Sequence, residues 1–95
     1  MNRKELEQEY INLGNVLSTY YPNKSFQNHC YWRIALDNTL HEQWNKQISS
    51  PAYKNLTDEQ LVNTIDLLRL YIKDEELLEK HNRLSLIYRG KISVS

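Results

Sequence analysis

Cysteine, glycine and proline are scarce in this chain of 95 residues, and each shortage excludes a class of protein. The single cysteine, Cys30, rules out an intramolecular disulfide framework and a zinc site built from several cysteines. Two glycines and two prolines leave little material for tight turns, which disfavours a fold of many strands. So few glycines also exclude a glycine-rich phosphate-binding loop. The composition therefore favours helices joined by few connections.

Net charge of one sign and long apolar runs are missing as well. Twelve basic and twelve acidic residues cancel, so the positive charge that drives nonspecific nucleic-acid binding is absent. No stretch approaches the roughly 20 apolar residues that cross a bilayer. The opening MNRKELEQEY lacks the apolar segment of a signal peptide. The sequence thus predicts a soluble, cytoplasmic protein that does not enter a membrane.

Charge is nevertheless uneven along the second half of the chain. Acidic residues prevail between Thr57 and Glu79, and cations without any acid follow them, namely Lys80, Arg83, Arg89 and Lys91. One interpretation is that cations gather at the end of a last helix, where the helix dipole favours them. The other is contact with nucleic acid or another anionic partner. We favour the first, and rank nucleic acid last among the partners considered.

Apolar residues recur every three or four positions in four segments, which predicts four helices. In the second segment Trp32, Leu36, Leu40 and Trp44 are spaced by four, and this is the most apolar face of the chain, so we expect this helix to be central. Short connections favour antiparallel neighbours. The prediction is a compact all-α bundle, one domain over residues 1–95, with helices at about 3–20, 28–48, 57–73 and 74–89.

Local signals mark several helix ends. Thr57 followed three residues later by Gln60 is typical of a capping box. Asp74 has the chemistry of an N-cap, and Gly90 that of a C-terminal stop. The segment YPNKSFQN, residues 21–28, is rich in residues of turns and caps and breaks the helical pattern.

A polar row runs beside the apolar stripe of the second predicted helix. His29, Arg33, Asp37 and His41 are each four residues apart, so all four project from one edge of that helix. The structural interpretation is an ion pair at the border between core and solvent. The functional interpretation is a polar patch with a carboxylate and a cation. Taken alone, the row favours the structural interpretation.

The last predicted helix has polar residues on its inward face, where they need partners. If this helix packs on the second one, Arg33 or Asp37 supplies those partners. The result is either a buried polar network, which we favour, or a cleft in which two arginines bind a phosphate or carboxylate. The candidate ligand-binding residues of such a cleft are Arg33, Asp37, His41, His81, Asn82 and Arg89.

Catalytic and metal-binding patterns are weak. Asp37 and His41 have a spacing that places two ligands on one helix face, with His81 as a third, but no H-E-x-x-H pattern accompanies them. Cys30 and His29 are adjacent, so on a helix they point about 100° apart and do not form a nucleophile and its base. We therefore predict no catalytic residue, no metal and no cofactor, and lean against an enzyme.

Aromatic residues exceed what the core of a small bundle needs. Seven tyrosines and two tryptophans are present, and aromatics left on a surface are typical of contact with another protein. The abundance of Asn, Lys and Tyr is typical of proteins from AT-rich bacterial or phage genomes. The function predicted is a noncatalytic helical module that binds a protein or a second copy of itself. The alternative is a binder of a small anion, or an enzyme, that uses the polar cleft.

Overall fold

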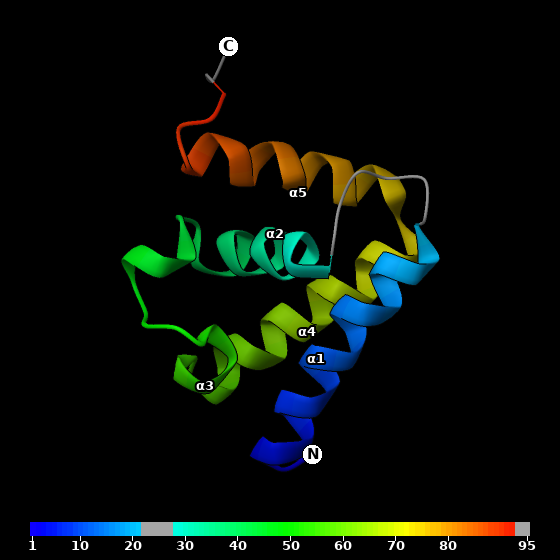
Figure 1. Cartoon of the computed structure of the whole chain (residues 1–95), viewed down its shortest axis with the longest axis vertical. Coiled ribbons are helices and arrows are strands. Elements are labelled where there is room, and N and C mark those ends of the chain that lie inside the picture. Colours follow the sequence, from blue (N-terminus) through cyan, green and yellow to red (C-terminus); the bar gives the residue numbers. More distant parts are fainter. Residues whose placement is uncertain (22–27, 93–95) are drawn as a thin grey trace.

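The computed structural model describes residues 1–21 and 28–92 and confirms the predicted compact all-α fold with four longer helices (Figure 1). The break predicted over residues 21–28 lies, for residues 22–27, outside the described residues. Among the helices of the described part, none is both long and apolar enough to cross a membrane. The elements are α1 (Arg3–Tyr20), α2 (Asn28–Leu40), the 3-10 helix η1 (Trp44–Lys46), α3 (Ala52–Asn55), α4 (Asp58–Lys73) and α5 (Glu75–Tyr88).

The helices form two interleaved pairs, α1 with α4 and α2 with α5 (Figure 1). Ion pairs join Arg3 to Asp58 and Glu9 to Arg69, so α1 and α4 run in the same direction. Figure 1 shows that α2 and α5 run in the same direction as well. The expectation of antiparallel neighbours concerned helices joined by short connections, whereas each of these two pairs consists of helices that do not follow each other directly in the chain.

The prediction that the second helix is central is confirmed, because α2 packs against α1, α4 and α5. Tyr31, Ile34 and Ala35 are completely buried on it. The apolar stripe of α4 packs against α2, which lies between α4 and α5 in the view of Figure 1. Its buried side chains are Leu61, Ile65, Leu68 and Tyr71.

Helix α2 ends at Leu40, so the predicted extent of 28–48 is wrong for its last two turns. His41 adopts a left-handed φ of 57°, and the N–H of Glu42 donates to the Asp37 carbonyl at 3.2 Å. This is the six-to-one hydrogen bond of a Schellman end. A histidine is an uncommon residue at this left-handed position, which glycine usually takes, and so the sequence did not mark the end.

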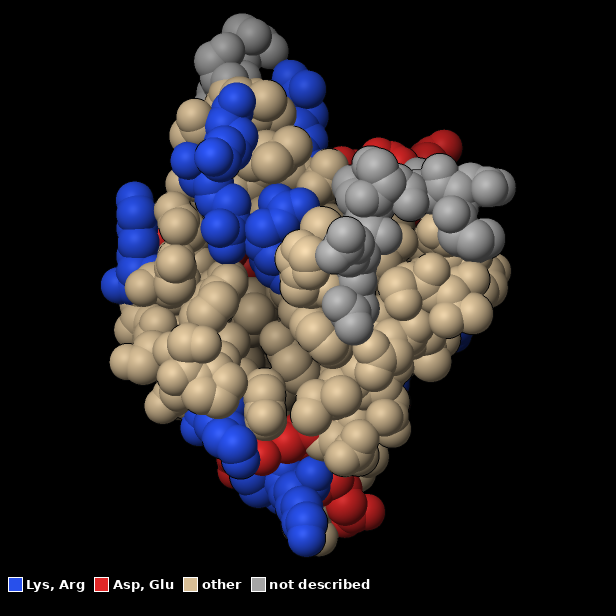
Figure 2. All heavy atoms as spheres, in the orientation of Figure 1, with Lys and Arg blue, Asp and Glu red and all other residues tan. Residues whose placement is uncertain are grey.

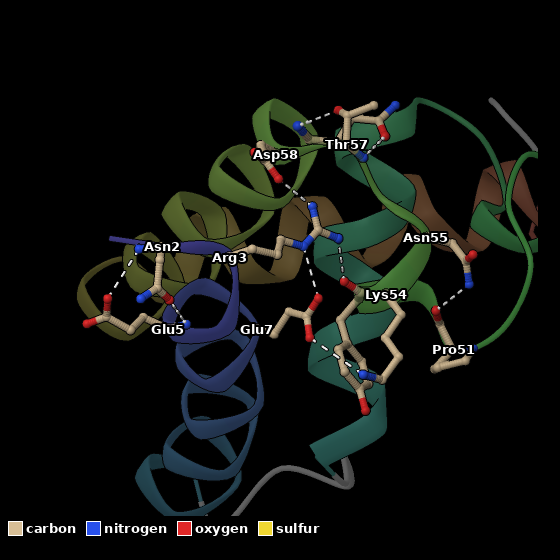
Figure 3. Close-up of polar contacts among 11 residues, drawn as sticks. Asn2, Arg3, Glu5, Glu7, Pro51, Lys54, Asn55, Thr57 and Asp58 are labelled. Atoms are coloured by element: carbon tan, nitrogen blue, oxygen red, sulfur yellow. Dashed lines mark hydrogen bonds and ion pairs between the residues drawn. The ribbon is translucent and has the colours of Figure 1, made fainter.

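The segment after α2 folds into η1 and the single-turn helix α3, which the sequence did not predict. Arg3 ties this segment to the starts of α1 and α4, as Figure 3 shows. Its guanidinium donates to Glu7 at 2.9 Å, to Asp58 at 2.7 Å and to the Tyr53 carbonyl at 2.9 Å. The position of α3 therefore depends on a side chain that lies about fifty positions away in the sequence.

The predicted caps of α4 and α5 are confirmed. The Thr57 hydroxyl accepts from the Gln60 N–H, and the Gln60 side chain accepts from the Thr57 N–H, so both halves of the capping box are present. Asp74 accepts from the Leu77 N–H at 3.0 Å. Gly90 takes a left-handed φ of 70° just after α5, where a side chain would be strained.

Gly14 allows α1 and α2 to approach closely. The Trp32 ring lies across this glycine, and its Nε1–H donates to the Tyr10 carbonyl at 2.9 Å. A Cβ atom built on Gly14 would lie 2.1 Å from Trp32 Nε1 and 2.2 Å from Cε2. The glycine is therefore required for the ring to lie flat on the helix.

We predict that Gly14→Ala destabilises the protein, although alanine is the better helix former by about 1 kcal/mol. The methyl group forces Trp32 away and costs about 1–3 kcal/mol through overpacking. Chemical denaturation measures the change, and Val16→Ala on the exposed side of the same helix is the control. A gain in stability for Gly14→Ala would show that the Trp32 contact is not formed.

Candidate functional site

Asp37 is the centre of a polar layer between α2 and α5. Its side chain is 0% exposed. Arg89 Nε donates to Asp37 Oδ2 at 2.7 Å, and Ser85 Oγ donates to the same oxygen at 2.6 Å. The N–H of Trp44 donates to Oδ1 at 2.9 Å. A buried carboxylate is costly without such partners, so these bonds explain how Asp37 is tolerated in the interior.

Arg33 joins the same layer, but its partners are neutral. Its Nη1 donates to Ser85 Oγ at 2.9 Å, and its Nη2 donates to Asn82 Oδ1 at 2.9 Å. The Ser85 hydroxyl therefore accepts from Arg33 and donates to Asp37. Arg89 thus binds the Asp37 carboxylate directly, whereas Arg33 is connected to it only through Ser85.

His81 and Tyr71 form a second polar contact beside this layer. The Tyr71 hydroxyl lies 2.8 Å from His81 Nδ1, and the two rings meet edge to face. Burial lowers the pKa of His81, with a smaller contribution from Lys80, and burial raises the pKa of Tyr71. Both shifts favour the neutral forms, and the tautomer of His81 sets whether the hydroxyl or Nδ1 is the donor. Asn38 Nδ2 donates to the His81 carbonyl at 2.9 Å, which ties this part of α5 to α2.

The six candidate residues separate into three groups in the structure. Hydrogen bonds bring Arg33, Asp37, Asn82 and Arg89 into the polar layer. His81 lies beside it on Tyr71, whereas His41 is exposed just beyond the end of α2. Across residues 1–21 and 28–92, no three His, Cys, Asp or Glu side chains come together as a group that could hold a metal ion.

A hollow of about 240 Å³ lies on the other side of α2, between α1, α2 and the segment that leads into α3. Figure 2 shows it near the middle of a face with few charged side chains, bordered above by Lys and Arg atoms. Aromatic rings make up much of its wall. The lining residues are Tyr10, Ile11, His29, Trp32, Arg33, Leu36, Trp44, Ser50, Pro51, Ala52 and Tyr53.

The walls of the hollow are held from several directions. Tyr10 stacks on Trp32 with ring centroids 5.6 Å apart, and Tyr53 lies tilted against Tyr10 at 5.7 Å. The hydrogen bond from Arg3 to the Tyr53 carbonyl fixes the Tyr53 side of the hollow. On the opposite side the Asp37 carboxylate holds the backbone of Trp44. The polar layer and the hollow are therefore connected, because Asp37 of the polar layer bonds the backbone of Trp44, which lines the hollow.

Arg33 is the one candidate residue that lines this hollow. None of the lining residues carries a carboxylate or a thiol, and Asp37 is already bonded to Ser85, Arg89 and Trp44. The arrangement thus supplies an apolar surface with a cation at its edge, which suits binding. It offers no carboxylate positioned to move a proton in the hollow.

Sequence reasoning missed most of the hollow. The spacing places Trp32 and Trp44 on an apolar stripe, and no local pattern gives Tyr53 a role. The signal that could have found them is the surplus of aromatics near Pro51, a rigid residue that also lines the hollow. No family model, curated protein or solved structure matches this chain.

We predict that Asp37→Asn destabilises the fold by about 3–5 kcal/mol, since it leaves the Arg89 charge without its carboxylate. Chemical denaturation measures the loss. The control is Asp66→Asn, because Asp66 forms an exposed pair with Arg69 at 3.7 Å. Breaking that surface pair changes the stability by less than about 1 kcal/mol. Equal effects of the two substitutions would contradict a buried polar layer.

We predict that the stability also depends on the protonation of His81. Because burial lowers the pKa of His81 from its ordinary 6.5, the unfolded chain binds this proton more readily than the folded chain. The His81 contribution is complete above pH 6.5 and is lost as the pH falls toward the lowered pKa. Denaturation measured from about pH 8 to about pH 5 should show a smaller decline for His81→Gln. Identical pH dependence of the two proteins would contradict the assignment.

Proposed function

We propose that this chain is a noncatalytic binding module that takes a large apolar side chain of another protein into its aromatic hollow. The single observation that carries the proposal is the hollow itself, with its stacked and tilted aromatic walls. An apolar cavity of about 150 Å³ holds a benzene ring, so a volume of about 240 Å³ is suited to a phenol or an indole.

The residue types of the hollow support a protein partner. Trp and Tyr are enriched at the positions that dominate binding energy between proteins, where one anchor side chain fills a pocket. The Trp32 ring is fixed before any ligand arrives, because its Nε1–H donates to the Tyr10 carbonyl, and the backbone of Trp44 is fixed by Asp37. Preformed walls lower the entropy that binding must overcome.

The setting we propose is the cytoplasm of a bacterial cell. The support is indirect and comes from composition, namely one cysteine in the chain and the many Asn, Lys and Tyr residues.

The proposal predicts which peptides the protein selects from a random library displayed on phage. We expect the enriched sequences to share one aromatic residue and to lose binding about tenfold or more in Trp44→Ala, since tryptophan is a frequent anchor of binding energy. This substitution removes one wall of the hollow and keeps the backbone bond to Asp37. NMR spectra confirm that the variant is folded.

Tyr20→Ala is the matched control, because Tyr20 is 57% exposed on α1 and does not line the hollow. Peptides that bind the wild type and Trp44→Ala equally would contradict the proposal. Light scattering tests the version in which the partner is a second copy. A dimer that dissociates in Trp44→Ala would identify the occupant of the hollow as a side chain of the same protein.

A further inference from the structure

Arg33 gives the hollow a positive charge with which no carboxylate of residues 1–21 and 28–92 forms an ion pair. Its guanidinium bonds to Ser85 Oγ and Asn82 Oδ1, which are both neutral oxygens. Within the described residues no carboxylate forms an ion pair with it, since the Asp37 carboxylate pairs with Arg89 instead. Ser85 connects Arg33 to Asp37, because its hydroxyl accepts from Arg33 and donates to the carboxylate, but the ion pair of that carboxylate is with Arg89.

The guanidinium of Arg33 also has N–H donors that its bonds to Ser85 and Asn82 do not use. A guanidinium has five N–H donors, and the hydrogen bonds of Arg33 to other described residues use two of them, which leaves three. The side chain is half-buried and lines the hollow. The two bonds that Arg33 donates to α5 fix the plane of its guanidinium, so an anion that binds Arg33 meets a positioned fork rather than a flexible side chain.

The charged residue type that lines the hollow determines whether an anionic or a cationic ligand is favoured there. His29 lies one helical turn before Arg33 and also lines the hollow, whereas no Asp or Glu does so. Aromatic walls alone would equally suit a quaternary ammonium group. The uncompensated guanidinium opposes such a cation, and it favours a carboxylate.

We propose that the partner segment carries a carboxylate beside its aromatic anchor: the ring enters the hollow while an adjacent Asp or Glu side chain binds Arg33. This inference rests on the proposed function and names the chemistry of its partner. Arg33 is then a binding residue and also a member of the polar layer between α2 and α5.

The test uses two capped tripeptides, Asp-Trp-Asp and Asn-Trp-Asn, which differ only in charge. Both are titrated into the full chain while NMR shifts of the hollow residues are followed. We expect the acidic peptide to bind about tenfold more tightly at low salt, since hydrogen bonds to charged groups are the stronger ones. High salt should reduce this difference.

Two variants test whether Arg33 causes the preference. Arg33→Gln should remove it, whereas Arg83→Gln, which changes an exposed arginine of α5, should keep it. If Arg33→Gln fails to fold, the two peptides on the wild-type protein at low and high salt still decide the question, because that comparison needs no variant.

The outcomes separate the two proposals. Equal binding of both peptides in the hollow overturns the carboxylate inference and leaves the apolar binding module intact. Failure of both peptides to shift the hollow residues overturns the binding module as well. Binding of N-acetyltryptophan as tightly as the acidic peptide would identify the occupant as a small aromatic acid, and a protein segment would be the wrong source.

Discussion

A single buried carboxylate organises this molecule. Asp37 stands in the middle of the central helix with no exposure to solvent, so every bonding site it has must be satisfied from within the protein. The partners come from α5, through Ser85 and Arg89, and from the chain just after α2, through the Trp44 N–H. The carboxylate thus determines which helix packs on α2 and where the chain turns after it.

The same helix separates two environments that depend on each other. One edge of α2 faces α5 through hydrogen bonds, and another forms a wall of the aromatic hollow. Arg33 belongs to both, because it is fixed by α5 and reaches the lining of the hollow. A polar network whose first effect is to hold helices together therefore also sets the charge of the surface that a partner would meet.

Local chemistry made most of the fold predictable, whereas long-range contacts made the site only partly so. The Thr57 capping box, the Asp74 cap and the Gly90 stop act within a few residues, and each is confirmed. The spacing of Arg33 and Asp37, with polar residues inward on the last helix, named the partners that would meet if the two helices packed together, and in the structure they do pack. The end of α2 was missed because His41 takes a conformation usually given to glycine. The hollow was missed because its walls come from segments far apart in the chain, and no local spacing reports their meeting.

The interleaving of α1 with α4 and of α2 with α5 has a consequence for how this chain acquires its structure. The hydrogen bonds across these pairs span 43 to 55 residues, about half of the sequence. Neither of the first two long helices finds its parallel partner until the later ones exist, so neither half of the polypeptide contains a complete pair. Large loops must close before these contacts can stabilise the protein. The entropy lost in closing them slows folding and makes it a concerted event. Severing the backbone between α2 and α4 would leave two fragments that each lack the other's complementary surface.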